Sequence, residues 1–190
     1  MSEESLQCFD DNESPTEGRP RSEVKKEPER WWHGGSAIWV INNRGEILCS
    51  RRALHCPGNP GKWQTCFGGH LPVGISFAQN ACKELAEELG VVCEESNFVF
   101  LRRVKDEKHK KIEEQFAIQL EIVPEECTFP DGEVTEVRWM TLEEARRQKE
   151  LHPKQWTNGC PKETEAAIKN VIPKIKPTTP PQLPLSSKRN

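Results

Sequence analysis

The stretch GGHLPVGISFAQNACKELAEELGVV, residues 68–92, carries the strongest structural signals in this chain. A pair of glycines opens it, and Ser76 followed by Gln79 forms a capping box, which starts a helix by satisfying backbone N–H groups in both directions. Gly90 is placed to end that helix, because glycine adopts the left-handed conformation without steric cost. The sequence therefore predicts a turn at the glycine pair and one helix between Ser76 and Gly90.

Three glutamates lie on this predicted helix: Glu84, Glu87 and Glu88. At about 100° per residue they fall on the arc beside the apolar face, which comprises Ala78, Ala81, Cys82, Leu85 and Leu89. Glutamates three and four residues apart repel one another by about 0.2–0.5 kcal/mol per pair. Because these glutamates repel one another and lie at the edge of a core, we expect a bound cation to offset their charge. Mg²⁺ is the hard ion that proteins bind through a few carboxylates plus substrate phosphates.

Composition excludes several functional classes. The chain has 190 residues and a formal net charge of -3, so it has no global attraction to nucleic acid or to an anionic membrane. It contains no apolar run long enough to span a bilayer and no signal-like start, so we expect a cytoplasmic protein. Its eight cysteines form no CxxC pair, and this argues against a zinc site.

Two polar segments flank the patterned part of the chain. Residues 1–29 are rich in charged residues, Ser and Pro and have almost no apolar periodicity, so we expect a disordered tail whose removal leaves the melting temperature nearly unchanged. Residues 173–190 are Pro-rich and are predicted to be disordered as well. The predicted organisation is one domain, residues 30–172, between two tails.

Strand and helix patterns alternate within that domain. Strands are predicted at residues 36–42, 46–52, 97–105, 111–123 and 133–140, and helices follow at residues 142–151 and 163–172. A tight turn at residues 43–45 makes the first two strands a hairpin. This order predicts an α/β fold with a mixed sheet and helices on its faces.

Residues 69–91 resemble the box of the Nudix hydrolases, a Gly, five residues, a Glu, seven residues, then Arg-Glu-apolar-any-Glu-Glu-any-Gly-apolar. The matching residues are Gly69, Glu84, Leu85, Glu87, Glu88, Gly90 and Val91. Two positions depart from the box: its first Glu is Ile75 and its Arg is Lys83. The resemblance extends over most of residues 31–172. It implies the Nudix fold, an α/β/α sandwich around a mixed β-sheet.

The resemblance also implies a chemistry. Glu84, Glu87 and Glu88 would bind Mg²⁺ or Mn²⁺, and Glu87 and Glu84 would be catalytic in the hydrolysis of a diphosphate linked to another group. A carboxylate outside the box, such as Glu114 or Glu133, could take the proton instead. Other candidates would bind the diphosphate: Gly68 and Gly69 through close backbone approach, and Arg51 and Arg52 through their guanidinium groups. The expected partner is a small-molecule diphosphate, such as a nucleoside diphosphate derivative, with no nucleic acid polymer or membrane.

The two departures bear on turnover. In the family the first Glu and the Arg pair and brace the helix, whereas Ile75 and Lys83 cannot make that bridge. We therefore expect a looser loop with intact carboxylates, and we expect Ile75→Glu with Lys83→Arg to raise activity or stability. A catalytically weakened Nudix domain that binds diphosphates is an alternative.

A second alternative comes from one branch of the family. The sequence around the glycine pair resembles isopentenyl-diphosphate isomerase, and in that branch His33, His70 and Glu114 (or Glu113) would bind metal. The isomerase places its catalytic Cys where this chain has Gly68, and Cys66 lies two residues earlier. Hydrolysis is therefore favoured over isomerisation.

Overall fold

The structure is a computed structural model, and it describes residues 3–157 and 160–171. The predicted Pro-rich tail at residues 173–190 lies outside the described residues. None of the described helices is long and apolar enough to cross a membrane.

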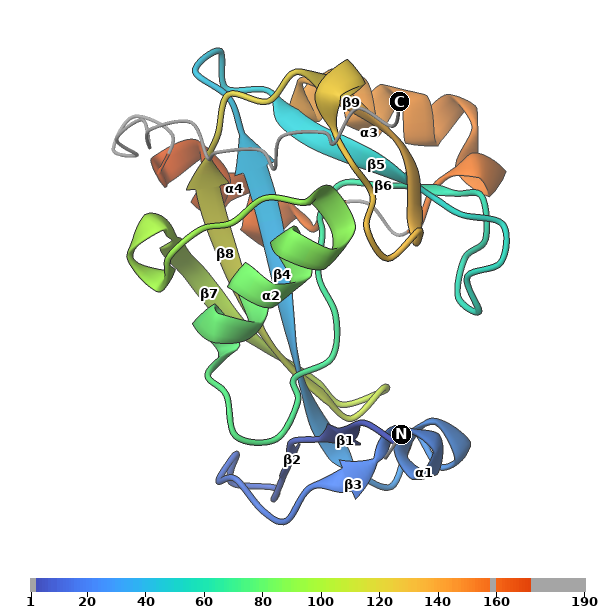
Figure 1. The fold of residues 1–190 in the computed structure, drawn as a ribbon, viewed down its shortest axis with the longest axis vertical. Helices are drawn as coiled ribbons and strands as arrows, with labels where there is room; N and C mark the ends of the chain where they lie inside the picture. Colours follow the sequence, from blue (N-terminus) through green and yellow to red (C-terminus); the bar gives the residue numbers. More distant parts are fainter. Residues whose placement is uncertain (1–2, 158–159, 172–190) are drawn as a thin grey trace, which may run out of the picture.

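A mixed sheet of seven strands forms the centre of the fold (Figure 1). The central strand β4 (Trp32–Ile41) pairs in parallel with β8 (Lys111–Gln119), which pairs antiparallel with β7 (Val99–Asp106). On the other side β4 pairs with β5 (Ile47–Arg52), and β5 pairs antiparallel with β6 (Trp63–Gln64) and β9 (Val134–Met140). The predicted strands and their mixed arrangement are therefore confirmed.

Helices cover both faces of this sheet. Helix α2 (Phe77–Leu89) lies in front of β4 and β8 in Figure 1. Its Leu85 and Leu89 pack on alternate β4 residues, Ile38 and Val40. The other alternate residues of β4, Ala37, Trp39 and Ile41, pack on the opposite face against helices α3 (Leu142–Leu151) and α4 (Lys162–Val171). Because successive side chains of a strand point to opposite faces, β4 serves two cores, and the result is the predicted α/β/α sandwich.

Local sequence signals determine where α2 begins and ends. The Ser76 hydroxyl accepts a hydrogen bond from the backbone N–H of Gln79 at 3.0 Å, and the Gln79 side chain accepts one from the backbone N–H of Ser76 at 2.9 Å. Gly90 has a φ of 70° and ends the helix in the left-handed conformation. The predicted capping box and terminal glycine are both confirmed.

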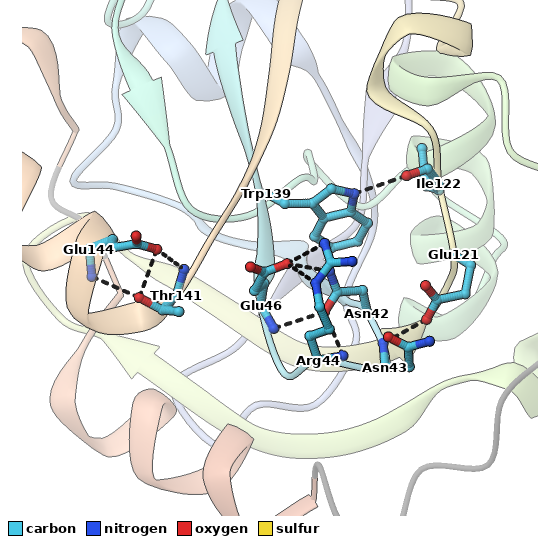
Figure 2. A network of polar contacts seen from close by, with 9 residues as sticks. All are labelled: Asn42, Asn43, Arg44, Glu46, Glu121, Ile122, Trp139, Thr141 and Glu144. Atoms are coloured by element: carbon cyan, nitrogen blue, oxygen red, sulfur yellow. Dashed lines mark hydrogen bonds and ion pairs between the residues drawn. The ribbon is translucent and has the colours of Figure 1, made fainter.

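The turn between β4 and β5 also forms as predicted (Figure 2). The Asn42 side chain accepts hydrogen bonds from the backbone N–H groups of Arg44 and Glu46, at 2.9 and 3.0 Å. The Arg44 guanidinium in turn bonds the Glu46 carboxylate at 2.6 Å. Figure 2 also shows Thr141 and Glu144, whose reciprocal hydrogen bonds begin α3. Hydrogen bonds between side chains and nearby backbone groups thus hold both the β4–β5 turn and the start of α3.

The N-terminal segment corrects the sequence-based expectation. Residues 3–29 were expected to be disordered, but they contain strands β1 (Ser5–Leu6), β2 (Cys8–Phe9) and β3 (Arg19–Pro20) and helix α1 (Arg21–Lys26). They lie at one end of β4 (Figure 1), where β2 adds to the sheet by pairing with β4. Their apolar residues are few, but the structure buries Leu6, Cys8, Phe9 and Val24. Leu6, Cys8 and Val24 form a small cluster of their own, and Phe9 packs with Trp32, Leu71 and Ile112. Composition underestimated this segment because a few well-placed apolar residues and backbone pairing with β4 are enough to fix it.

Candidate active site

The glycine pair lies against the central strand. The segment around it pairs antiparallel with β4 at two isolated positions, Gly35 with His70 and Ile38 with Phe67. Gly68 has a φ of 138°, and a Cβ there would lie 2.0 Å from the carbonyl oxygen of Ser36. Only glycine therefore fits at this position.

Gly69 faces the helix that carries the glutamates. A Cβ at Gly69 would lie 2.5 and 2.6 Å from the two carboxylate oxygens of Glu84. The backbone N–H of Gly68 lies 3.4 Å from Oε1 of Glu88, as a long hydrogen bond. The absence of side chains at the turn thus lets its backbone pack directly against two carboxylates.

The three glutamates differ in their surroundings. Glu84 and Glu88 are buried, whereas the Glu87 side chain is 46% exposed. Burial raises the pKa of Glu84 to about 7. Burial also raises the pKa of Glu88 well above its usual range, and the neighbouring Glu84 raises it further. Two carboxyl groups are therefore held where their charged forms need a cation.

Lys83 supplies one positive charge to this group. Its ammonium lies 2.7 Å from Oε2 of Glu87 and 3.5 Å from Oε1 of Glu84. Ile75, at the other departure from the box, packs with Phe77 against an apolar cluster that includes Phe9 of the N-terminal segment. The two residues that depart from the box therefore contact different partners. Lys83 is ion-paired with glutamates of α2, and Ile75 holds its loop through apolar packing.

A cavity of about 230 Å³ opens beside these residues. Six carboxylates line it: Glu4, Glu84, Glu87, Glu88, Asp131 and Glu133. Four cationic side chains line it as well: Arg21, Arg52, Lys83 and Lys111. Its other described lining residues are His70 and the glycine pair, so no aliphatic side chain lines it. A larger cavity, about 430 Å³, lies on the α3 and α4 side of the sheet away from the glutamates.

The carboxylates fit a hard divalent cation. Oε2 of Glu88 is buried and has no hydrogen-bond partner among the described residues, and both oxygens of Glu84 face the open side of Gly69. Within residues 3–157 and 160–171, however, no three His, Cys, Asp or Glu side chains are grouped closely enough to hold an ion by themselves. Mg²⁺ commonly takes one or two carboxylates and completes its shell with water and substrate phosphates. Glu84 and Glu88 could hold such an ion.

The histidine set expected from the isomerase branch is only partly assembled. His33 and His70 stack with ring centroids 5.4 Å apart. Burial lowers the pKa of His70 to about 3, and Arg21 lowers it further. Glu114 does not line the cavity, because it is ion-paired with Arg103 at 3.1 Å. The structure therefore offers no support for Glu114 as a third ligand beside the two histidines, and that role stays a prediction.

The alternative Glu113 also has a partner, since its carboxylate lies 2.5 Å from the Lys111 ammonium. Lys111 in turn lines the cavity. Both candidate glutamates are thus ion-paired with cationic side chains.

The side chains of Arg51 and Arg52, which were both expected to bind the diphosphate, point to different places. Arg52 lines the cavity, where its guanidinium lies 3.6 Å from the Glu133 carboxylate. Arg51 points elsewhere, donating to the carbonyl of Gly61 at 3.2 Å and lying 3.7 Å from Glu136. Adjacent residues on a strand face opposite sides, so only one of the two could reach the site.

Sequence reasoning missed four lining residues: Glu4, Arg21, Lys111 and Asp131. The first two fell in the segment expected to be disordered. Lys111 is the first residue of the strand predicted at residues 111–123, and Asp131 lies in the connection between β8 and β9. No local periodicity marks any of them.

Comparison with known proteins agrees with this architecture. The NUDIX domain family matches residues 31–158. The chain is 35% identical over 89 residues to the uncharacterized Nudix hydrolase PA4841 of Pseudomonas aeruginosa, covering 46% of this chain and 51% of that protein. It is 27% identical over 140 residues to an isopentenyl-diphosphate Delta-isomerase of Nocardia farcinica, covering 73% of this chain and 79% of the isomerase.

Among solved structures, DR0079 from Deinococcus radiodurans superposes with a TM-score of 0.67 at 14% identity, covering 87% of this chain and 98% of that one. A MutT protein from Methanosarcina mazei superposes with a TM-score of 0.53 at 20% identity, covering 72% and 93%. These likenesses concern the fold. The chain belongs to the Nudix superfamily. It spans about half the length of the Pseudomonas relative.

Proposed function

We propose that this chain is a Mg²⁺-dependent pyrophosphohydrolase, also able to use Mn²⁺, that cleaves a diphosphate linkage in a nucleoside diphosphate derivative or a related organic pyrophosphate. The observation that carries the proposal is the pair of buried carboxylates, Glu84 and Glu88, against the glycine turn, with one Glu88 oxygen unpartnered among the described residues. Membership of the Nudix superfamily supports the same reaction class.

The roles follow from position. Glu84 and Glu88 would hold the cation, which when bound neutralises diphosphate oxygens and lowers the pKa of water. Glu87 is the most exposed of the three and meets water at the cavity, so Glu87 or Glu84 would accept the proton of the attacking water. Arg52 and Lys111 would bind phosphate oxygens. Gly68 and Gly69 line the same cavity, so their backbone would contact the phosphates.

The cavity also bears on the organic group of the substrate. Its described lining is charged or glycine apart from His70, and no aliphatic side chain is present to cover a hydrocarbon chain. An isoprenoid tail would leave apolar surface against ionised groups, which is unfavourable. The lining therefore favours a diphosphate with a polar organic group.

Isomerase chemistry is less well supported. A Cys at position 68 is sterically blocked by the carbonyl of Ser36. Cys66 packs against the core on the α3 and α4 side of the sheet, does not line the cavity, and burial strongly raises the pKa of its thiol. A domain that binds diphosphates without cleaving them is the second candidate, and the Lys83 ion pairs favour it because they already neutralise part of the carboxylate charge.

The test compares the parent protein with Glu88→Gln and with a matched control, Glu163→Gln, whose side chain is 71% exposed on α4. Each is incubated with nucleoside diphosphates, nucleoside diphosphate sugars and isopentenyl diphosphate in Mg²⁺ or Mn²⁺, and released phosphate and monophosphate are measured. The parent and the control should hydrolyse a polar diphosphate equally, and Glu88→Gln should be slower by at least about 100-fold. Equal activity in all three would exclude Glu88 from the reaction.

A further inference from the structure

The N-terminal segment forms one wall of the candidate active site. Glu4 and Arg21 line the same cavity as the glycine pair and the three glutamates. Both residues precede residue 31, where the match to the NUDIX domain begins. The match to the family therefore does not explain why Glu4 and Arg21 lie at the cavity.

Backbone contacts hold this segment beside the glycine turn. The N–H of Gln7 donates to the carbonyl of Leu71 at 2.8 Å, and the N–H of Val73 donates to the carbonyl of Ser5 at 3.1 Å. Leu6, between the two contacts, is completely buried. The segment is thus bonded directly to the loop that follows the glycine pair, so its position relative to the site is determined.

Arg21 is the cation that this segment brings to the cavity. Its guanidinium lies 2.8 Å from the Glu4 carboxylate, and its backbone N–H donates to the Glu4 carbonyl at 2.9 Å. The side chain remains 39% exposed. A guanidinium has five N–H donors in a planar fork, and one ion pair with Glu4 leaves donors for an oxyanion in the cavity.

Arg21 does not stand alone on its side of the cavity. Arg21 and Lys111 both lower the pKa of His70, after the larger effect of burial, so both positive charges lie within electrostatic reach of that imidazole. Arg52 is instead associated with Glu88 and Glu133. Arg21, Arg52 and Lys111 thus line one cavity together with the carboxylates, where they would bind the oxygens of a diphosphate.

We propose that Arg21 is a substrate-binding residue, which donates to a phosphate oxygen of the diphosphate, and that Glu4 positions it while opposing the approach of the anion. This inference rests on the proposed function of the same site. It assigns to the N-terminal segment a part in substrate recognition, in addition to its part in the fold.

The test uses full-length protein and methylenediphosphonate, a diphosphate analogue that is not hydrolysed, with Mg²⁺. Binding is measured by titration calorimetry for the parent, Arg21→Gln, Glu4→Gln and the control Arg19→Gln. Arg19 is ion-paired with Glu23 at 3.4 Å and is not among the lining residues of the cavity. Melting temperatures are measured for all four proteins.

The two cavity variants should change binding in opposite directions. Arg21→Gln should raise the Kd about tenfold, as expected for losing a charge-assisted hydrogen bond. Glu4→Gln should lower the Kd about threefold by removing an anion, and Arg19→Gln should leave it unchanged. Arg21→Lys should restore only part of the affinity, since a point charge replaces the planar fork. In hydrolysis assays Arg21→Gln should raise KM with kcat within about twofold.

A purely structural ion pair gives a different result. If Arg21 and Glu4 only stabilise the fold, both variants lower the melting temperature equally and neither changes the Kd, and the proposal is overturned. The proposed hydrolysis can fail separately. If the parent releases no product from any diphosphate but the Kd values still change in opposite directions, the role of Arg21 stands and only the hydrolytic function is rejected.

Discussion

The ammonium of Lys83 lies 2.7 Å from the carboxylate of Glu87, one helical turn further along α2. The same ammonium is 3.5 Å from the Glu84 carboxylate. Helix α2 thus carries a cation of its own among the carboxylates that would bind a metal. As an ion pair it contributes little to stability, because both side chains are more than a third exposed. Its larger effect should be on metal binding.

Replacing Lys83 should strengthen metal binding. In Lys83→Met the ammonium no longer competes with a divalent ion for Glu84 and Glu87, so we expect Mg²⁺ and Mn²⁺ to bind about five- to tenfold more tightly, roughly 1–1.4 kcal/mol. Titration calorimetry without substrate measures this. Lys169→Met is the matched control, since Lys169 forms an i,i+4 pair with Glu165 on α4. Unchanged or weaker binding in Lys83→Met would show that the metal does not use these carboxylates.

Stability without metal should fall as the pH rises. The pKa of buried Glu84 is raised from 4.5 to about 7, so the folded state favours the protonated form. The contribution of protonated Glu84 to the free energy of unfolding is complete below the unfolded-state pKa near 4.5, and it is lost as the pH rises through 7. Urea unfolding in EDTA should therefore show a free energy of unfolding lower at pH 8 than at pH 5, by up to about 3 kcal/mol from this group. Glu84→Gln should flatten the profile, and a parent profile that rises over this range would contradict the assignment.

Restoring the motif at position 75 should destabilise the protein. Ile75 packs against the cluster that contains Phe9 and Leu71, so Ile75→Glu places a charge against apolar side chains. We expect a loss of about 1–3 kcal/mol in the free energy of unfolding, with or without Lys83→Arg. Val92→Glu, at a position 72% exposed, should be nearly neutral. This replaces the sequence-based expectation that the double substitution would raise stability, and a double variant more stable than the parent would restore it.

The N-terminal segment should contribute to global stability. Leu6 is fully buried, and Leu6→Ala should cost about 2–5 kcal/mol in urea unfolding. The control Leu54→Ala, at a position 83% exposed, should change stability by less than about 0.5 kcal/mol. Removal of residues 1–28 should lower the melting temperature substantially, contrary to the expectation from composition. An unchanged melting temperature after removal would mean that these residues do not stabilise the domain.

Much of the fold could be predicted because its signals are local. The capping box at Ser76, the left-handed Gly90 and the apolar stripe of α2 each depend on residues within one or two helical turns. The same periodicity placed Glu84 and Glu88 at the edge of the core. The order of the strand and helix patterns likewise indicated a sheet with helices on its faces.

The amino-acid sequence alone was enough to predict the glutamate helix, the superfamily and most strands and helices after residue 30, since helix and strand periods and backbone caps are properties of neighbouring residues. The pairing of Glu114 with Arg103 on the neighbouring strand, in contrast, depends on the tertiary structure. The tertiary structure also placed Arg21 on the cavity, beside residues almost 50 positions later in the chain. Such contacts join distant segments whose packing depends on the whole fold, and no local pattern records which partners they will meet.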